Sequence, residues 1–262
     1  MGRVVVWIAT ACVVAFFAVG GLYVWHGNAP YSPPAAAKAA PKNGLVKAAA
    51  RAAIAAAPGA MRIMLVGNSV AHSLAPAIGA QPGVAVFDAS WIGCQFPPQI
   101  PTAIAAPNGG LEVAPPCDPP GEADAVTRFS PNVAVWIPAD FYGAGGHYEG
   151  VEVKPCSPGF DSLYRSDLVA EVRQLGSTGA RVVLANQPYS RAAYFPRHDR
   201  AIDCENRVVA DVAHAMGAQL LDLLDYVCPK SACRSELRSD GIHYAGRSAK
   251  IVARWISEQV TR

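Results

Sequence analysis

The sequence predicts an α/β fold: a three-layer α/β/α sandwich with a mostly parallel sheet of about five strands, covered by helices on both faces. Two observations predict it. Short, mainly apolar runs bounded by turn residues recur along the chain, and segments with the apolar spacing of helices lie between them. Strands that are apolar on both faces are typical of a buried parallel sheet. The ligand site of such a sheet lies beyond the carboxyl ends of its strands.

The predicted strands are short apolar runs, each close to a glycine or proline that limits it. They are Arg62–Val66, Val84–Phe87, Val133–Ile137, Arg181–Ala185 and Gln219–Leu223. Amphipathic helices are indicated where apolar residues recur every three or four positions. These positions are Tyr164, Leu168, Val172 and Leu175; Val208, Val209, Val212 and Met216; and Ala249, Val252, Ile256 and Val260. Gly217 follows the second group, as expected of a helix C-cap.

An apolar segment from Val4 to Trp25 has no charged residue and is long enough to cross a bilayer, which takes about 20 helical residues. Arg3 precedes it and no lysine or arginine follows closely, so the positive-inside rule places the N-terminus in the cytoplasm. A cleaved signal peptide is the alternative, because the Ala-rich stretch after Pro34 offers small residues for cleavage. Under both interpretations the remaining chain is exported. We favour a single-pass anchor in the cell membrane, formed by residues 1–26.

Residues 27–60 are predicted to be an Ala- and Pro-rich linker. Its first part cannot be helical throughout, because Pro33 and Pro34 lack a backbone N–H. Leu45–Ala57 is compatible with a helix, since alanine favours one, but has little apolar surface to bury. We therefore expect the extracytoplasmic domain to begin near Met61 and to comprise residues 61–262.

Six cysteines lie beyond the apolar segment, and an even number in an exported domain indicates disulfides. The sequence does not choose among the possible pairings. We favour the sequential set, which pairs Cys94 with Cys117, Cys156 with Cys204, and Cys228 with Cys233. Zinc binding is the weaker alternative, because there is no CxxC pair and no HExxH motif. No cofactor is expected, and a net charge of +2 without a basic run gives no indication of a nucleic-acid partner.

Two Pro-rich segments, Gly93–Ser130 and Tyr142–Gly159, each follow a predicted strand and carry cysteines. Long loops at the carboxyl edge of a parallel sheet are often functional. They are interpreted as functional loops, as covers held by disulfides, or as both.

Ser69 is the first candidate for chemistry. It follows the first predicted strand in the sequence Gly67-Asn68-Ser69-Val70, where a serine hydroxyl projects over the edge of the sheet. Its backbone N–H lies at a helix N-terminus and can donate to a developing oxyanion. The alternative is that Ser69 only caps the helix, a role that serine favours. Pro76 predicts that this helix is short or kinked.

Asp240 and His243 form the second candidate, directly before the last predicted helix. A serine nucleophile needs a base, and the base needs a carboxylate that orients it. An Asp and a His three residues apart on a turn can meet, leaving the second ring nitrogen for the serine. The alternative is a capping Asp beside an unrelated His.

Together these motifs resemble those of the SGNH (GDSL-like) hydrolase superfamily. The resemblance rests on Val66-Gly67-Asn68-Ser69, on Asp240-Gly241-Ile242-His243-Tyr244 and on the helix that includes Ala249–Trp255, and it covers residues 61–262. It implies a flavodoxin-like sandwich. Bacterial SGNH domains that are fused to, or act with, membrane O-acyltransferases of the cell envelope are especially similar, since they share the pair seen here as Gly93-Cys94.

The resemblance also implies roles for individual residues. Ser69 is implied as the nucleophile, His243 as the base and Asp240 as its partner. The Ser69 and Gly93 N–H groups are implied as oxyanion donors. The third donor of the family is an asparagine, and Asp140 stands in its place here. A carboxylate there repels an oxyanion unless it is protonated. Asn68 stands where the family usually has an aspartate.

These observations favour a membrane-anchored, exported serine esterase or O-acyltransferase that acts on acylated glycans or lipids of the cell envelope through an acyl-enzyme. One alternative is a non-catalytic SGNH-like module that binds glycan or a membrane acyltransferase partner. The other is a structural envelope protein whose serine is only a cap. Three further residues are interpreted without a site role: His72 at the surface, Trp136 in the core, and Asn206 as the cap of a helix that begins there.

Overall fold

The computed structural model describes residues 42–100, 103–105, 111–114, 117, 121–138, 146–149, 151–193 and 197–261. The chain divides into two compact units, Met1–Ala35 and Ala36–Arg262, and all described residues belong to the second. The predicted membrane segment Val4–Trp25 lies outside the described residues. Within them, no helix has the length and apolar character that a bilayer crossing requires.

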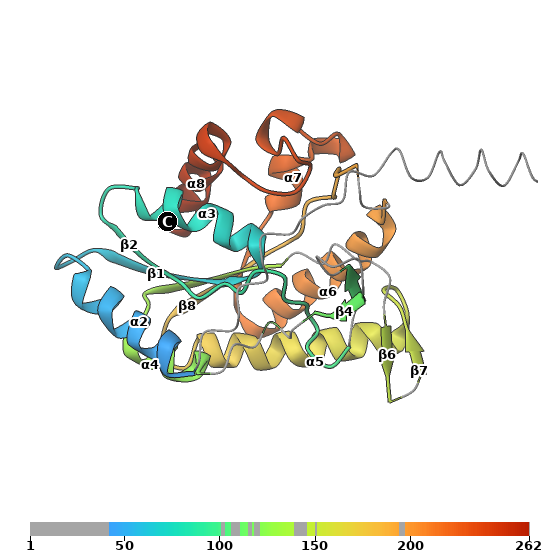
Figure 1. Cartoon of the computed structure of the whole chain (residues 1–262), viewed down its shortest axis with the longest axis horizontal. Coiled ribbons are helices and arrows are strands. Elements are labelled where there is room, and N and C mark those ends of the chain that lie inside the picture. Colours follow the sequence, from blue (N-terminus) through green and yellow to red (C-terminus); the bar gives the residue numbers. More distant parts are fainter. Residues whose placement is uncertain are drawn as a thin grey trace, which may run out of the picture. The chain divides into compact units, whose positions relative to one another are not determined.

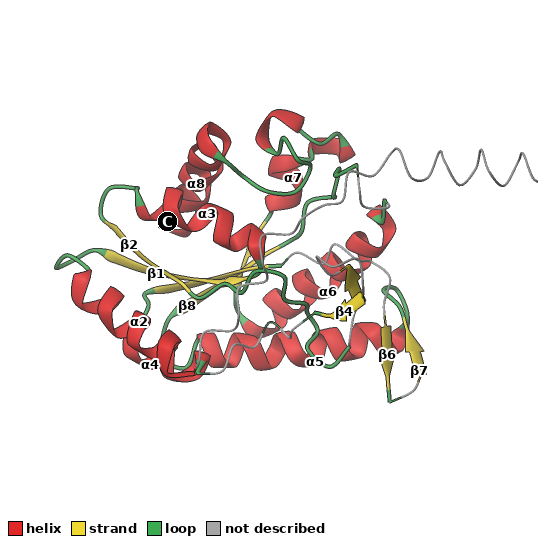
Figure 2. Ribbon diagram, in the orientation of Figure 1, coloured by secondary structure: helices red, strands yellow, loops and turns green. Residues whose placement is uncertain are grey.

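A parallel five-stranded sheet forms the centre of the fold, with the strand order β2-β1-β5-β8-β9 (Figures 1 and 2). The strands are β1 (Met61–Gly67), β2 (Val84–Asp88), β5 (Val133–Ile137), β8 (Arg181–Ala185) and β9 (Gln219–Leu221). This confirms the predicted parallel α/β sheet, with strand ends shifted by up to two residues. After β1 the chain forms β2 on one side and β5 on the other. The carboxyl ends of β1 and β5 therefore make the switch point at which such sheets bind ligands.

Alternate residues of each strand face two separate cores. In β1, Ile63 and Leu65 point into one core, while Met64 and Val66 point into the other, and all four are buried. Figure 1 shows the helices on the two sides of the sheet. One core is covered by α3 (Ser69–Gly79), α7 (Leu223–Val227) and α8 (Gly246–Val260), the other by α2 (Lys42–Ala55), α4 (Glu122–Phe129), α5 (Pro158–Leu175) and α6 (Asp199–Met216).

The helix α2 belongs to the packed unit, although its residues were predicted to be part of a linker. It packs against α4 and β2, and Ala49 is fully buried in the core beneath it. The small alanine side chains allow the helix backbone to approach its neighbours closely. The folded unit therefore begins upstream of Met61, while the prediction of a helix in this stretch agrees with α2.

The two Pro-rich segments contain more regular structure than the sequence predicted. The first contains a hairpin of β3 (Ala103–Ala105) and β4 (Leu111–Val113), followed by α4. The second contains a hairpin of β6 (Gly146–Tyr148) and β7 (Val151–Val153). The short helix α4 is anchored by three buried side chains, Ala125, Val126 and Phe129. Short 3₁₀ turns follow α7, at Pro229–Ser231 and Ser235–Leu237.

Three disulfides join Cys94 to Cys117, Cys156 to Cys204, and Cys228 to Cys233, which confirms the predicted pairing. The Cys94–Cys117 disulfide joins the loop after β2 to the segment before α4. The Cys156–Cys204 disulfide joins the segment before α5 to helix α6. Three disulfides in one domain indicate an oxidising, extracytoplasmic compartment.

Candidate active site

The carboxyl end of β1 is shaped by Gly67. Its φ angle is +133°, and a Cβ atom there would lie 2.1 Å from the carbonyl oxygen of Ile137 on β5. Only glycine combines this backbone conformation with such a close approach. The Gly67 carbonyl accepts a hydrogen bond from the Trp91 N–H at 2.8 Å, which holds the loop after β2 against the end of β1.

Asn68 caps helix α3. Its side-chain oxygen accepts a hydrogen bond from the Val70 N–H at 3.1 Å, and its backbone carbonyl accepts one from the His72 N–H at 3.0 Å. Ser69 is therefore the first residue of the helix and does not act as its cap. The helix runs for 11 residues and includes Pro76, so it does not end at this proline.

A tight turn before α8 presents the candidate acid and base. The Oδ1 atom of Asp240 accepts hydrogen bonds from the N–H groups of Ile242 and His243, each at 2.8 Å. Ile242 and Tyr244, on either side of His243, are only 1% and 2% exposed. The turn is thus fixed by its own backbone and by two buried anchors, while His243 itself remains half-buried at the surface.

The three predicted side chains form a connected triad. The His243 Nδ1 atom lies 2.7 Å from Asp240 Oδ2, and the Nε2 atom lies 2.9 Å from Ser69 Oγ. An ionised Asp240 accepts the Nδ1 proton, which leaves Nε2 to accept the Ser69 hydroxyl proton. Burial acts to raise the pKa of Asp240, but hydrogen bonds from the His243 ring and from the Ile242 and His243 N–H groups hold it below its usual value. Asp240 is therefore poised to remain ionised beside an imidazolium.

Ser73 links the two halves of the triad, and no motif in the sequence points to it. Its Oγ donates to the Val70 carbonyl at 2.7 Å and accepts from the Tyr244 N–H at 3.3 Å. The helix that carries Ser69 is thereby bonded to the turn that carries His243.

The turn is also held from the side of β8. The Arg191 N–H donates to the Gly241 carbonyl at 3.0 Å, and the Gly241 N–H donates to the Arg238 carbonyl at 2.9 Å. A Cβ on Gly241 would lie 2.2 Å from the Ala192 nitrogen. The buried Arg238 side chain donates from Nη2 to the Tyr189 carbonyl at 2.8 Å. The segment after β8 is thus a rigid support for the Asp240–His243 turn.

Asn206 helps to order that segment, and its predicted role was wrong. Helix α6 begins at Asp199, so Asn206 lies in its interior and not at its start. Its side-chain oxygen accepts from the Gln187 N–H at 2.7 Å, and its Nδ2 donates to the Gln187 carbonyl at 2.9 Å. The start of α6 was missed because the residues from Asp199 to Asn206 are mainly polar and interrupt the apolar spacing, although Ile202 and Cys204 among them are buried.

The structure describes two of the three residues implied in oxyanion binding, Ser69 and Gly93. The Ser69 N–H lies in the first turn of α3, where backbone N–H groups have no partner within the helix. Gly93 lies in the half-buried loop that Trp91 ties to Gly67, and it has a φ angle of +77°. Asp140 lies outside the described residues.

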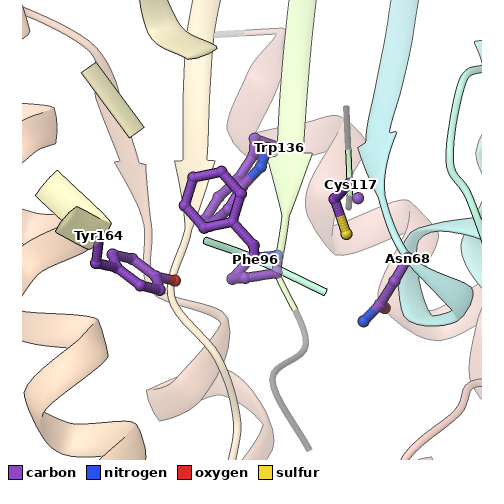
Figure 3. A pocket seen from close by; sticks show the side chains of 7 residues that line it. Asn68, Phe96, Cys117, Trp136 and Tyr164 are labelled. Carbon is purple, nitrogen blue, oxygen red and sulfur yellow. The ribbon is translucent and has the colours of Figure 1, made fainter. Parts of the chain in front are cut away.

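A small pocket lies beside Gly67 and Asn68, the two residues before Ser69, and Tyr164 of α5 forms part of its wall (Figure 3). Its lining residues are Gly67, Asn68, Phe96, Cys117, Trp136, Pro138 and Tyr164. Trp136 is 1% exposed, which confirms its predicted place in the core, and it also forms part of this wall. The pocket was not predicted, because its walls come from five separate parts of the sequence.

Other polar residues near the triad have structural partners. His72 is exposed and its Nδ1 atom lies 2.7 Å from Asp88 Oδ2, in agreement with its interpretation as a surface residue. Within the described part of the chain, no three His, Cys, Asp or Glu side chains gather as a metal site requires.

Comparison with known proteins gives no match to a family model and none to a curated protein. Solved structures do match. One is a GDSL-like lipase from Bacteroides thetaiotaomicron, with a TM-score of 0.53, 15% identity, and coverage of 84% of this chain and 98% of that one. A candidate acylhydrolase from Bacteroides fragilis has a TM-score of 0.53 and 14% identity, with 81% of this chain and 93% of that one covered. A candidate SGNH hydrolase from Slackia heliotrinireducens has a TM-score of 0.52 and 16% identity, with 77% of this chain and 99% of that one covered. The fold of this chain is therefore that of the SGNH and GDSL-like hydrolases.

Proposed function

We propose that this protein is a carboxylic ester hydrolase or acyltransferase that works through an acyl-enzyme on Ser69. One observation carries the proposal: His243 lies within hydrogen-bond distance of Ser69 on one ring nitrogen and of Asp240 on the other. This is the nucleophile, base and orienting acid that acyl transfer to serine needs. Its position at the switch point of a parallel sheet, where ligands bind in such folds, supports the same conclusion.

In the first step the Ser69 oxygen attacks the ester carbonyl carbon while His243 Nε2 takes the hydroxyl proton. The carbonyl π electrons move to the oxygen, which approaches the first turn of α3, where the Ser69 N–H and the helix dipole stabilise its negative charge. The tetrahedral intermediate then expels the alkoxide, which receives the proton from His243. In the second step His243 takes the proton of a water or an acceptor hydroxyl, whose oxygen attacks the acyl carbon. The bond between that carbon and Ser69 Oγ then breaks, Oγ takes the proton back from His243, and the acid or the new ester leaves.

We propose further that the substrates are acylated glycans or lipids of the cell envelope and that the chain is held at the membrane by Val4–Trp25. The apolar, uncharged character of that segment and the three disulfides support an exported location. A membrane acyltransferase is the proposed partner if the acyl group is transferred to a sugar hydroxyl. This part of the proposal rests on the sequence resemblance.

A fluorophosphonate probe tests the central proposal. The oxidised full-length protein is labelled beside Ser69→Ala and beside Ser248→Ala, whose hydroxyl accepts from the Ala245 N–H at the start of α8 and does not contact the triad. We expect label at Ser69 in the wild type and in Ser248→Ala, and none in Ser69→Ala. A folded wild-type protein that takes no label contradicts the proposal and favours a binding module instead.

A further inference from the structure

The pocket beside the triad is small. It has a volume of about 10 Å³, which is the space of roughly one water-sized group. Gly67 and Asn68, the two residues directly before Ser69, form one end of it. The pocket therefore lies next to the backbone that carries Ser69. The opposite walls are aromatic, and Figure 3 shows Phe96 between Trp136 and Tyr164.

Phe96 is the wall residue that closes the pocket. Its ring meets the edges of Trp136 and Tyr164, with both ring centroids at 5.1 Å and interplanar angles of 69° and 85°. Trp136 and Tyr164 are each 1% exposed, so they cannot move away from Phe96 without disturbing the core. Phe96 itself is half-buried. It is thus the wall side chain that can be shortened with the least damage to the core.

The backbone on both sides of the wall is also fixed. Cys94, two residues before Phe96, is bonded to Cys117, which lines the pocket. The Cys117 N–H donates to the Gln95 carbonyl at 2.8 Å, and the Gln95 side chain donates to the Ile100 carbonyl at 2.6 Å. A covalent bridge and a hydrogen-bonded loop therefore hold this side of the pocket and resist its widening by a longer acyl chain.

From this geometry we propose that the pocket receives the acyl chain during catalysis, that it admits an acetyl group and excludes longer acyl chains, and that Phe96 sets this limit. The inference rests on the proposed function. In the acyl-enzyme the carbonyl carbon is bonded to Ser69 Oγ, the carbonyl oxygen faces the first turn of α3, and the methyl group of the acetyl unit occupies the pocket. The faces of the Phe96 and Trp136 rings match a methyl group.

The test compares p-nitrophenyl acetate, butyrate and octanoate as acyl donors for the full-length oxidised protein. Turnover gives kcat/KM, and intact mass identifies the acyl adduct on Ser69 where the acyl-enzyme accumulates. We expect the acetate to exceed the butyrate at least about 10-fold, because each excess methylene in a closed apolar pocket is discriminated by about that factor. Phe96→Ala should raise the butyrate-to-acetate ratio by about 10-fold or more.

The controls separate pocket shape from stability. Phe160 packs on Tyr164 with centroids 5.9 Å apart but does not line the pocket, so Phe160→Leu should leave the ratio unchanged. Phe96→Leu serves as a milder second variant. The double variant Cys94→Ser, Cys117→Ser should relax the chain-length limit in the same direction as Phe96→Ala.

The outcomes distinguish this inference from the proposed function. Rapid butyrate or octanoate turnover by a wild type that labels with fluorophosphonate overturns the acetyl limit while the serine hydrolase remains. An unchanged ratio in both Phe96 variants also overturns it, as does a reactive Ser69 that neither turns over the acetate ester nor forms an acetyl adduct. If Ser69 takes neither the phosphonate nor any acyl group, both proposals fail.

Discussion

The Ser73 hydroxyl accepts a hydrogen bond from the Tyr244 backbone N–H at 3.3 Å, although the two residues lie 171 positions apart in the sequence. The same hydroxyl donates to the Val70 carbonyl within α3. One side chain therefore connects the first turn of the nucleophile helix with the residue that follows the base. The Ser69–His243 distance depends on this connection as well as on the packing of the two elements.

Ser73→Ala should lower kcat more than it changes KM, because it loosens the approach of His243 to Ser69 without touching substrate. A misplacement of about 1 Å costs up to about 10²-fold in rate, and the lost hydrogen bond costs about 1 kcal/mol of stability. Steady-state kinetics and denaturant unfolding measure the two effects. Ser73→Thr keeps the hydroxyl and should restore most of kcat. Equal kinetics for Ser73→Ala and wild type would remove Ser73 from a positioning role.

Asp240→Asn should reduce kcat by between about 10² and 10⁴-fold while the turn remains folded. The asparagine oxygen can still accept from the Ile242 and His243 N–H groups, but its amide donates to His243 Nδ1 and selects the wrong tautomer. Nε2 then carries the proton and cannot accept one from Ser69. Activity assays with circular dichroism check this. Full turnover by the variant would show that His243 does not need its carboxylate.

Asp167→Asn should stabilise the protein by about 1 kcal/mol at neutral pH. Burial raises the pKa of Asp167, only partly offset by the hydrogen bond that Gln99 donates to Oδ1 at 2.5 Å, and among the described residues Oδ2 has no donor. Because the pKa of Asp167 is higher in the folded than in the unfolded state, the ionised carboxylate lowers the free energy of unfolding. This loss of stability is largest at pH values above the raised pKa, and it disappears as the pH falls towards about 3.8.

Thermal unfolding of Asp167→Asn and wild type at several pH values tests the predicted direction of this pH dependence. The gain should shrink as the solution becomes acidic. Asp211→Asn is the matched control, since Asp211 is exposed and pairs with Arg165 at the surface. A gain from Asp167→Asn that is independent of pH would contradict the assignment to ionisation.

Removal of the Cys156–Cys204 disulfide should cost more stability than removal of Cys228–Cys233. The first closes a sequence separation of 48 residues and the second a separation of 5, and the entropy that a crosslink removes from the unfolded chain grows with loop length. We expect about 2–4 kcal/mol for the first pair replaced by serines, and less for the second. Urea unfolding of both double variants under oxidising conditions gives the comparison. The reverse order would mean that native packing around the short loop dominates.

The triad could be predicted because each of its motifs is local. Ser69 directly follows a strand that its apolar run reveals, and Asp240 and His243 share one turn. The topology of a parallel sheet then brings both to the same edge. The sequential disulfide pairing that we favoured is the one in the structure, although the sequence itself did not choose among the possible pairings.

The supporting contacts could not be predicted, because they depend on side chains from distant segments. Ser73 has no motif, and the bond from Asn206 to the Gln187 backbone appears only when α6 lies beside the end of β8. The packing of α2 was missed for a similar reason. A stretch rich in alanine has the same composition in a free tether and in a helix whose small side chains, such as Ala49, fit closely against a neighbour.

The 174 positions that separate Ser69 from His243 give the order of synthesis a chemical meaning. A ribosome releases the nucleophile and the strands of the sheet before the base. Partly translated chains are therefore unable to attack an ester, however well their first strands have paired. In refolding, serine reactivity returns only when the Asp240–His243 turn has packed beside Ser69. A covalent probe of Ser69 therefore reports when this turn docks.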